Sequence, residues 1–260
     1  MPKLAITGKG GVGKTTLSAL LAYTYAQEGN KVVAIDADPD ANLASALGVP
    51  KDLADQIAPI AKMDDLIEER TGARPGQSGG FFSLNPRVDD IPDRFSTTHR
   101  GIKLLVLGTI GRGGGGCICP ESSLLKNLVR HLFVGRSEVV ILDMEAGLEH
   151  LGRGTASAVD AFIVVVEPGQ RSLQTAEAVR RLAADIGIHK VYFVGNKMRD
   201  EKDRAFVQEH LPNDEVLGFL PFSEKAISAD MRGLAVFDAD EPLVAAAKEI
   251  KDKLAHLTKT

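Results

Sequence analysis

A glycine-rich segment near the N-terminus constrains this chain more than any other part of it. Residues 8–16 read Gly-Lys-Gly-Gly-Val-Gly-Lys-Thr-Thr. Gly8, Gly13, Lys14 and Thr15 satisfy the G-x-x-x-x-G-K-[ST] pattern of a phosphate-binding loop. Glycines let the backbone wrap an anion, and the helix that follows directs its unpaired N–H groups at the phosphates. The segment therefore predicts a nucleotide site between a strand and a helix.

The residue types assign roles within this loop. Lys14 is expected to reach the β- and γ-phosphates, and Thr15 to offer its hydroxyl to Mg²⁺. A glycine-rich turn without a ligand is one alternative. A dinucleotide-binding loop is another, because the glycines also spell G-x-G-x-x-G and Asp36 follows about twenty residues later. A dinucleotide has no γ-phosphate for Lys14 to contact, which favours the nucleoside triphosphate reading.

Six short apolar runs alternate with helical patterns along the chain. Each run is continuously apolar, which is typical of strands buried on both faces in a parallel sheet. We therefore predict an α/β fold, a doubly wound, mostly parallel sheet with helices on both faces, formed by residues 1–260 as a single P-loop ATPase domain. The runs are residues 4–6, 32–35, 104–107, 139–142, 162–166 and 191–194.

Other segments predict smaller features. Residues 64–70 indicate an exposed helix, residues 72–80 a Gly/Pro-rich loop, and residues 81–91 a small hairpin. Residues 241–257 indicate a closing helix, and we expect its apolar stripe to pack into the core. The alternative is that this stripe binds a membrane or a partner protein.

Composition and charge exclude several classes of partner. The 260 residues carry a net charge of −4, which provides no field that favours nucleic acid or anionic lipid. The longest apolar stretch, residues 161–166, is far shorter than a membrane span, and no hydrophobic signal core follows Lys3. We expect a cytoplasmic protein with no nucleic-acid partner and no stable membrane association.

Acidic residues follow two of the predicted strands. Asp36, Asp38, Asp40 and Asn42 come after the second run, and Asp143 comes directly after the run at 139–142. A solvated turn is the alternative reading of the first group, because Asp is common in turns. At the end of its strand, Asp143 stands where an acid that organises magnesium is expected.

The chain has only two cysteines, Cys117 and Cys119. In extended backbone, residues two apart point to the same side, so both sulfurs can face one ion such as Zn²⁺, Ni²⁺ or Cu⁺. Two thiolates do not complete a tetrahedral site, whereas a two-fold dimer would supply four. A buried inert pair and a redox dithiol are the alternatives.

Lys9 adds a second lysine to the phosphate loop. The segment resembles the KGGxGK[ST][ST] loop of the MinD, ParA, ArsA and nitrogenase iron-protein superfamily. The resemblance implies that Lys9 reaches across a dimer interface to the partner's nucleotide, a solvated lysine being the alternative. It also implies that Asp38 orients or activates the attacking water, so the predicted catalytic residues are Lys9, Lys14 and Asp38.

The same resemblance assigns a base pocket. Asn196 stands at the superfamily's adenine-recognition position, and Pro221 and Phe222 are expected to line the pocket, a simple turn being the alternative for this pair. The residues expected at ATP or ADP and Mg²⁺ are Gly10, Gly11, Val12, Gly13, Lys14, Thr15, Thr16, Asp143, Asn196, Lys197, Pro221 and Phe222.

Three segments together are similar to the CooC family, the accessory ATPases that help insert nickel into carbon monoxide dehydrogenase. They are residues 116–121, 141–154 and 195–197. The resemblance implies a nucleotide- and metal-dependent homodimer that holds Ni²⁺ or Zn²⁺ between paired Cys117 and Cys119, with the carbon monoxide dehydrogenase apo-enzyme as partner. It also places Glu145 where other superfamily members have proline. Glu149 and His150 are either further metal ligands or, as we expect, switch or structural residues.

Two other functions remain open from the sequence. An iron–sulfur reductase like the nitrogenase iron protein would bridge a cluster with two cysteines far apart in the chain, whereas this chain has one tight pair. A positioning ATPase like MinD or ParA would need an amphipathic or basic C-terminal device. Such a device is not favoured, because the lysines near the C-terminus are interspersed with Glu249 and Asp252. These lysines are Lys248, Lys251, Lys253 and Lys259.

Overall fold

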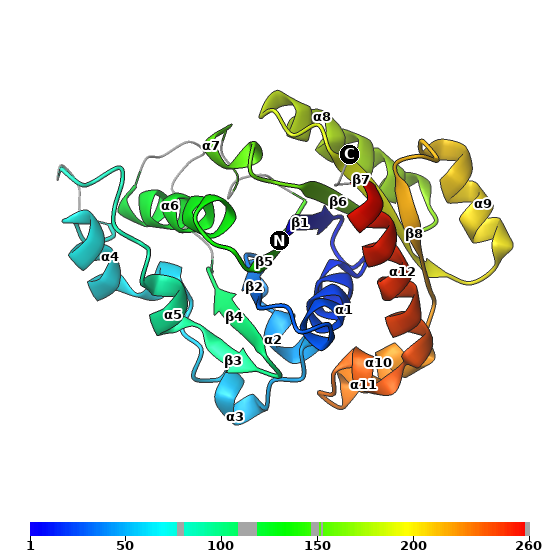
Figure 1. Ribbon diagram of the computed structural model, residues 1–260, viewed down its shortest axis with the longest axis horizontal. Coiled ribbons are helices and arrows are strands. Elements are labelled where there is room, and N and C mark those ends of the chain that lie inside the picture. The colour runs from blue at the N-terminus through cyan, green and yellow to red at the C-terminus, as the bar shows by residue number, and fades with distance from the viewer. Residues whose placement is uncertain (77–80, 109–118, 147–150, 152, 258–260) are drawn as a thin grey trace.

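The computed structural model describes residues 1–76, 81–108, 119–146, 151 and 153–257. Within this part of the chain, the strands form an eight-stranded sheet in the order β3-β4-β2-β5-β1-β6-β7-β8 (Figure 1). All neighbouring strands run parallel except the pair β3 and β4. The strands are β1 (Lys3–Gly8), β2 (Val32–Asp36), β3 (Thr97–His99), β4 (Ile102–Val106), β5 (Val139–Asp143), β6 (Ala161–Val166), β7 (Val191–Met198) and β8 (Val216–Pro221).

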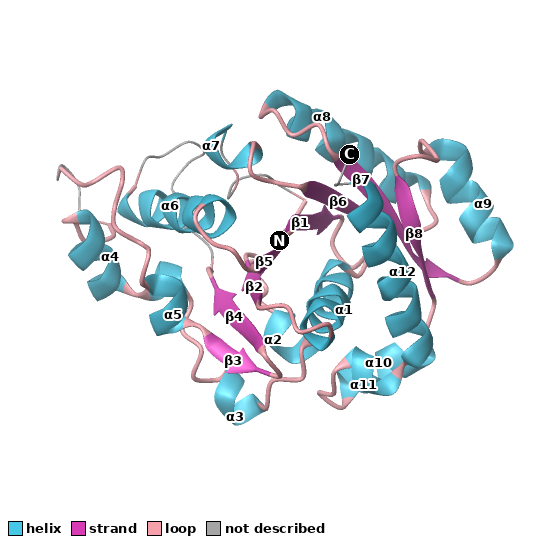
Figure 2. Ribbon diagram, viewed as in Figure 1, coloured by secondary structure: helices cyan, strands magenta, loops and turns pink. Residues whose placement is uncertain are grey.

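Helices cover both faces of this sheet (Figure 2). Alternate residues of a strand point to opposite faces, and the buried side chains accordingly divide into two clusters, one containing Leu4 and Ile6 and the other Ala5. The first cluster includes residues of α1 (Lys14–Gln27), α2 (Leu43–Ala46), α11 (Val236–Ala239) and α12 (Glu241–Leu257). The second includes residues of α4 (Asp64–Thr71), α5 (Ile91–Phe95), α6 (Pro120–Val134), α7 (Arg153–Ala156), α8 (Gln170–Asp185) and α9 (Glu201–His210).

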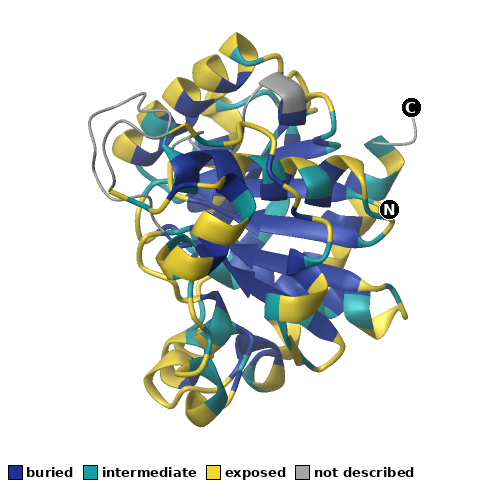
Figure 3. Cartoon of the chain, turned by 90° about the vertical axis from the view of Figure 1, so that its left-hand side faces the viewer, coloured by how far each residue is buried: buried dark blue, intermediate teal, exposed yellow. Residues whose placement is uncertain are grey.

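The continuously apolar runs are strands because both of their faces are covered. Every residue of β1, β2, β5 and β6 is buried, and the strands form the dark interior of Figure 3. This confirms the predicted doubly wound, mostly parallel fold. The shorter elements α3 (Lys51–Ala54), η1 (Ile60–Lys62) and α10 (Glu224–Met231) connect the larger ones.

The predicted closing helix is α12, with the bounds expected from the sequence. Its apolar stripe is buried against the sheet: Leu243, Ala247, Ile250 and Leu254 are each at most 2% exposed. The stripe is therefore part of the core. Among the described residues, no helix combines the length and the apolar character needed to cross a lipid bilayer.

The hairpin predicted over residues 81–91 is wrong. The antiparallel pair is instead β3 with β4, in which His99 pairs with Ile102. The two residues between them, Arg100 and Gly101, have φ of 50° and 78°, the positive values that a two-residue hairpin turn requires. The apolar residues after 81 misled the prediction, because Phe81 is fully exposed and Ile91 begins α5.

The parallel arrangement determines where functional side chains gather. In a parallel sheet the carboxyl ends of the strands lie at one edge. Asp36 of β2 pairs in register with Asp143 of β5, and Asp143 pairs with Ile6 of β1. The acids predicted from separate segments therefore meet beside the loop that follows β1.

Candidate nucleotide site

The phosphate loop joins β1 to α1 through backbone that favours glycine. Gly13 precedes the helix with φ of 97°, and no side chain caps the helix there. The first N–H groups of a helix have no partner within it, and they attract anions. A Cβ at Gly13 would lie 2.0 Å from the Nδ2 atom of Asn196. Glycine is therefore required at this position on two grounds, conformation and space.

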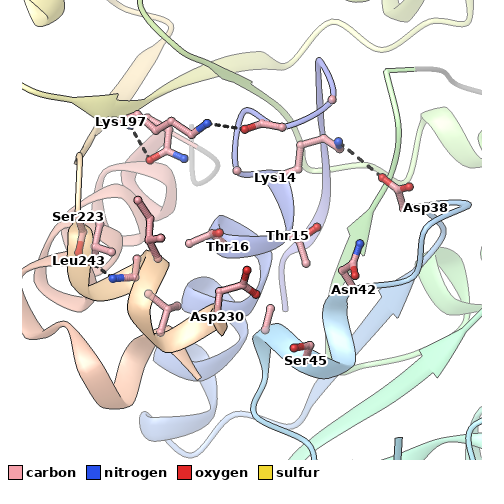
Figure 4. Close-up of a pocket in the computed structure, with 18 of the residues that line it drawn as sticks. Lys14, Thr15, Thr16, Asp38, Asn42, Ser45, Lys197, Ser223, Asp230 and Leu243 are labelled. Carbon is pink, nitrogen blue, oxygen red and sulfur yellow. Dashed lines mark hydrogen bonds and ion pairs between the residues drawn. The ribbon is translucent and has the colours of Figure 1, made fainter. Parts of the chain in front are cut away.

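A cavity of about 890 Å³ opens beside the loop, within the usual size range of small-molecule sites. It brings the loop, the segment after β2, the segment after β5 and the ends of β7 and β8 to one place (Figure 4). Of the predicted residues, the cavity is lined by Gly10, Gly11, Gly13, Lys14, Thr15, Thr16, Asp38, Asn196, Lys197, Pro221 and Phe222.

Lys14 and Asp38 face each other across this cavity. The Lys14 Nζ atom lies 3.6 Å from the Asp38 Oδ2 atom, and the two side chains are 7% and 15% exposed. Figure 4 shows both side chains directed into the space between the loop and the segment after β2. The cation expected at the phosphates and the carboxylate expected at the attacking water thus lie side by side.

Asp36 is completely buried, and both of its carboxylate oxygens accept hydrogen bonds from the backbone. The Asp38 N–H donates to Oδ1 at 3.1 Å, and the Leu43 N–H donates to Oδ2 at 2.8 Å. Burial raises the pKa of Asp36 to about 6, although these backbone bonds oppose the rise. Asp36 therefore fixes both ends of the segment that carries Asp38.

Asp143 is also completely buried, but neither carboxylate oxygen has a hydrogen-bond partner among the described residues. Burial raises the pKa of Asp143 to about 7, opposed by the neighbouring Thr15 hydroxyl, while the Asp36 charge adds to the rise. Carboxylate and hydroxyl oxygens are ligands that Mg²⁺ prefers. Two orphaned oxygens beside Thr15 and the phosphate loop fit a magnesium ion, which Asp143 and Thr15 would hold.

Asn196 and Lys197 contact the phosphate loop itself. Asn196 is 6% exposed, and its Nδ2 donates to the Val12 carbonyl at 2.7 Å. The Lys197 Nζ atom donates to the Gly11 carbonyl at 2.6 Å and lies 3.3 Å from Glu167 Oε2. The amide that the resemblance assigns to adenine therefore donates its hydrogen bond to the loop.

Lys9 and Cys119 are not among the described residues that line the cavity. Lys9 is half-buried, and its carbonyl accepts from the Val12 N–H at 3.3 Å. Cys119 precedes α6 with the extended φ and ψ of −119° and 160° that the paired arrangement requires. Cys117, Glu149 and His150 lie outside the described residues. Within the described ranges, no three metal-ligating side chains gather in one place.

Sequence reasoning missed one wall of the cavity. That wall comes from α10 and its surroundings, and its only sequence signal is the helical spacing of residues 226, 227, 230 and 234 after β8. The missed residues of this wall are Ser223, Ala226, Ile227, Asp230, Leu234, Val236 and Leu243. Ser45, Ala46 and Ala146 also line the cavity and were not predicted, whereas the lining residues Asp40, Asn42 and Glu145 lie in segments that the sequence had singled out.

The chain resembles characterised and uncharacterised nucleotide-binding proteins in sequence. Residues 3–236 match the CobQ/CobB/MinD/ParA nucleotide binding domain family. The chain is 50% identical over 236 residues to the carbon monoxide dehydrogenase accessory protein CooC of Rhodospirillum rubrum. The aligned region covers 91% of this chain and 89% of that protein. It is 45% identical over 260 residues to an uncharacterized ATP-binding protein of Methanocaldococcus jannaschii, covering 99% and 98% of the two chains.

Solved structures agree in fold. The MinC:MinD cell division protein complex of Aquifex aeolicus matches with a TM-score of 0.69 and 23% identity, covering 100% of this chain and 96% of that chain. The MinD protein of Pyrococcus horikoshii complexed with Mg-ADP matches with a TM-score of 0.65 and 19% identity, covering 99% and 98%. The chain therefore belongs to the CobQ/CobB/MinD/ParA family of nucleotide-binding P-loop ATPases and, within that family, to the group that contains CooC.

Proposed function

We propose that this ATPase is a metallochaperone that couples ATP binding and hydrolysis to nickel insertion into carbon monoxide dehydrogenase. The observation that carries the proposal is the 50% identity to CooC of Rhodospirillum rubrum over 91% of the chain. That relative is named as an accessory protein of carbon monoxide dehydrogenase. The proposal implies that this chain works in the cytoplasm, where its apo-enzyme partner would receive the metal.

The hydrolytic step rests on residues that the structure brings together. Lys14 would neutralise charge on the β- and γ-phosphates, and the helix N-terminus would bind the same oxygens. Asp38, held 3.6 Å from the Lys14 Nζ atom, would accept a hydrogen bond from the attacking water once phosphate separates the two side chains. A bound Mg²⁺ would supply charge neutralisation at the β- and γ-phosphate oxygens. Asp143 and Thr15 would hold that ion.

The metal cargo would bind at a dimer interface through Cys117 and Cys119. One chain supplies only two thiolates, and a four-coordinate site needs the pair of a second chain. Lys9 would couple the two events, because a lysine that contacts only the partner's nucleotide gives ATP a higher affinity for the dimer than for the monomer. ATP binding would thus assemble the metal site, and hydrolysis would reopen it.

The test is metal stoichiometry measured together with mass. Anaerobically purified protein is titrated with Ni²⁺ and, separately, with Zn²⁺, in the presence of ADP or a non-hydrolysable ATP analogue, and its mass is measured by sedimentation. We expect one tightly bound ion per dimer. The Cys117→Ser/Cys119→Ser double variant should lose the ion and keep nucleotide binding, whereas Lys9→Ala should keep nucleotide binding and lose the analogue-dependent dimer.

Two outcomes would contradict the proposal. Tight binding of one ion per monomer, undiminished in the double serine variant, would place the metal elsewhere. An apo-enzyme of carbon monoxide dehydrogenase that gains the same activity from nickel with or without this protein and ATP would remove the accessory role. Visible absorption that the anaerobically purified protein shows before any metal is added, and that depends on both cysteines, would instead indicate an iron–sulfur reductase.

A positioning role like that of MinD is not favoured by the packing of α12. The apolar stripe that such a role would present to a surface is buried in the core, with Leu243 and Leu254 2% and 1% exposed. Lys251 is also held within the protein, because its ammonium group pairs with Glu28 and Asp252. The described part of this helix therefore offers no apolar stripe to a membrane, and its exposed Lys248 and Lys253 are interspersed with exposed Glu249 and Asp252.

A further inference from the structure

Two consecutive side chains at the end of β7 bind two consecutive carbonyl groups of the phosphate loop. Asn196 Nδ2 donates to the Val12 carbonyl at 2.7 Å, and Lys197 Nζ donates to the Gly11 carbonyl at 2.6 Å. Figure 4 shows the Lys197 side chain lying along the cavity rim with its ammonium group directed at the loop. These contacts join residues that are more than 180 positions apart in the chain.

The Asn196 side chain packs against the phosphate loop at Val12 and Gly13. Its side-chain oxygen accepts from the Lys197 N–H at 2.8 Å, so both ends of the amide are engaged within the protein. The amide also occupies the space that a Cβ at Gly13 would need, since that Cβ would lie 2.0 Å from the Asn196 Nδ2 atom. The loop and the amide therefore fit each other closely.

Lys197 is held in a backbone conformation that residues other than glycine rarely adopt. Its φ is 60°, in the left-handed region, next to an irregularity in the pairing of β7 with β8. The ammonium group lies 3.3 Å from Glu167 Oε2. Glu167 is in turn anchored by a 3.0 Å bond from its N–H to the Ser172 hydroxyl. Local strain of this kind persists where surrounding contacts require it.

The geometry of the peptide plane gives these contacts a consequence for anion binding. The carbonyl of one residue and the N–H of the next lie in one plane and point in opposite directions. Asn196 fixes the Val12 carbonyl, so the Gly13 N–H points in the opposite direction within the same plane, away from Asn196. Lys197 fixes the Gly11 carbonyl, and the N–H of that plane, on Val12, donates to the Lys9 carbonyl at 3.3 Å.

We propose that Asn196 and Lys197 are positioning residues that hold the phosphate loop in its anion-binding form before a nucleotide arrives. They act on the polyphosphate through the loop, so their effect is the same for any base. This role differs from the adenine recognition that family resemblance assigns to Asn196. It depends on nucleotide binding by the loop and not on the accessory function proposed above.

The experiment distinguishes affinity for the phosphates from affinity for the base. Binding of Mg²⁺-tripolyphosphate, ATP and GTP is measured by calorimetry for the parent, Lys197→Met, Lys197→Arg, Glu167→Gln and Asn196→Ala. The control is Lys202→Met, which changes an exposed lysine of α9 that does not line the cavity. Thermal unfolding of each variant identifies any loss of folding.

We expect Lys197→Met to lose about fivefold in affinity for all three ligands, since one charge-assisted bond to the loop is lost. Lys197→Arg should restore most of that affinity, Glu167→Gln should show a smaller loss of the same kind, and Lys202→Met should match the parent. Asn196→Ala should lose affinity for tripolyphosphate as well as for ATP.

Three results would overturn the proposal. In the first, Lys197→Met and Asn196→Ala bind tripolyphosphate as the parent does and lose only ATP, which would make both residues readers of the base. In the second, the ratio of ATP to GTP affinity changes while tripolyphosphate affinity does not. In the third, the parent binds ATP but not tripolyphosphate, which would show that the loop is not arranged in advance. A parent that binds none of the three ligands would instead contradict nucleotide binding itself.

Discussion

Asp36 and Asp143 end neighbouring strands, pair in register and are both completely buried, yet their surroundings differ. Asp36 accepts backbone hydrogen bonds from Asp38 and Leu43, whereas neither oxygen of Asp143 has a partner within the described residues. A buried carboxylate without partners is costly. One residue type thus has two different surroundings: Asp36 holds the segment that carries Asp38, whereas both oxygens of Asp143 are unpaired within the described residues, as the proposed magnesium site requires.

The largest expected effect comes from Asp143→Asn. The substitution keeps the shape of the side chain and removes the charge that would hold Mg²⁺, so ATP turnover should fall by about 100-fold or more. The free energy of unfolding of the nucleotide-free protein should not fall, because no hydrogen bond is lost. Turnover at saturating Mg²⁺ and urea denaturation would measure the two quantities. Turnover equal to that of the parent would contradict the assignment of Asp143 to the ion.

Asp36→Ala, unlike Asp143→Asn, should lower the stability of the nucleotide-free protein. Two buried backbone N–H groups would lose their acceptor, which lowers the free energy of unfolding by about 2–4 kcal/mol. Turnover should also fall, because Asp38 would no longer be fixed. Urea denaturation in the absence of nucleotide checks the first effect, with Asp143→Asn as the matched control. Equal stability of the two variants would remove the distinction between the two aspartates.

The raised pKa values predict a pH dependence of stability. A carboxyl group whose pKa rises on folding stabilises the folded chain fully below its unfolded value, near 4, and this contribution is lost as the pH rises through the folded value. For Asp143 the folded pKa is about 7, so the loss falls between about pH 4 and 7. Denaturation of the metal-free parent should show this decline, and Asp143→Asn should show less of it. Parallel curves for the two proteins would argue against the raised pKa.

The smallest effect is expected for Asp40→Asn. Asp40 is exposed, and its N–H donates to Asp38 Oδ1 at 3.1 Å, a backbone bond that the substitution keeps. Stability should stay within about 0.5 kcal/mol of the parent value. Turnover should change little, since Asp40 does not contact Lys14. A loss as large as that of Asp36→Ala would show that the charge of the whole segment matters and not the buried contacts of one residue.

The elements that the sequence predicts well are those whose pattern repeats. Continuous apolar runs identified six of the strands, and the stripe from Leu243 to Leu254 identified α12 with its observed bounds. The 3.6 Å distance between Lys14 and Asp38 agrees with the roles that the loop motif and the superfamily resemblance assign to these two residues. In each case many residues contribute to one signal.

The features that the sequence missed depend on single contacts. The hairpin lies at Arg100 and Gly101 because two residues adopt positive φ, and only the glycine of that pair carries a signal. The contact of Lys197 with the Gly11 carbonyl depends on an unusual φ and on a residue far away in the chain. The cavity wall of α10 carries Asp230 and Ile227, whose spacing is that of any helix.

The two outer strands of the sheet have a consequence for how the protein can assemble. Exposed strand edges invite pairing with another chain, and short or irregular edges prevent it. One edge is β3, only three residues long; the other is β8, whose pairing shifts in register and which ends at Pro221. Continued sheet growth is therefore disfavoured at both sides. A second copy of this chain would therefore have to associate through helix or loop surfaces and not by extending the sheet.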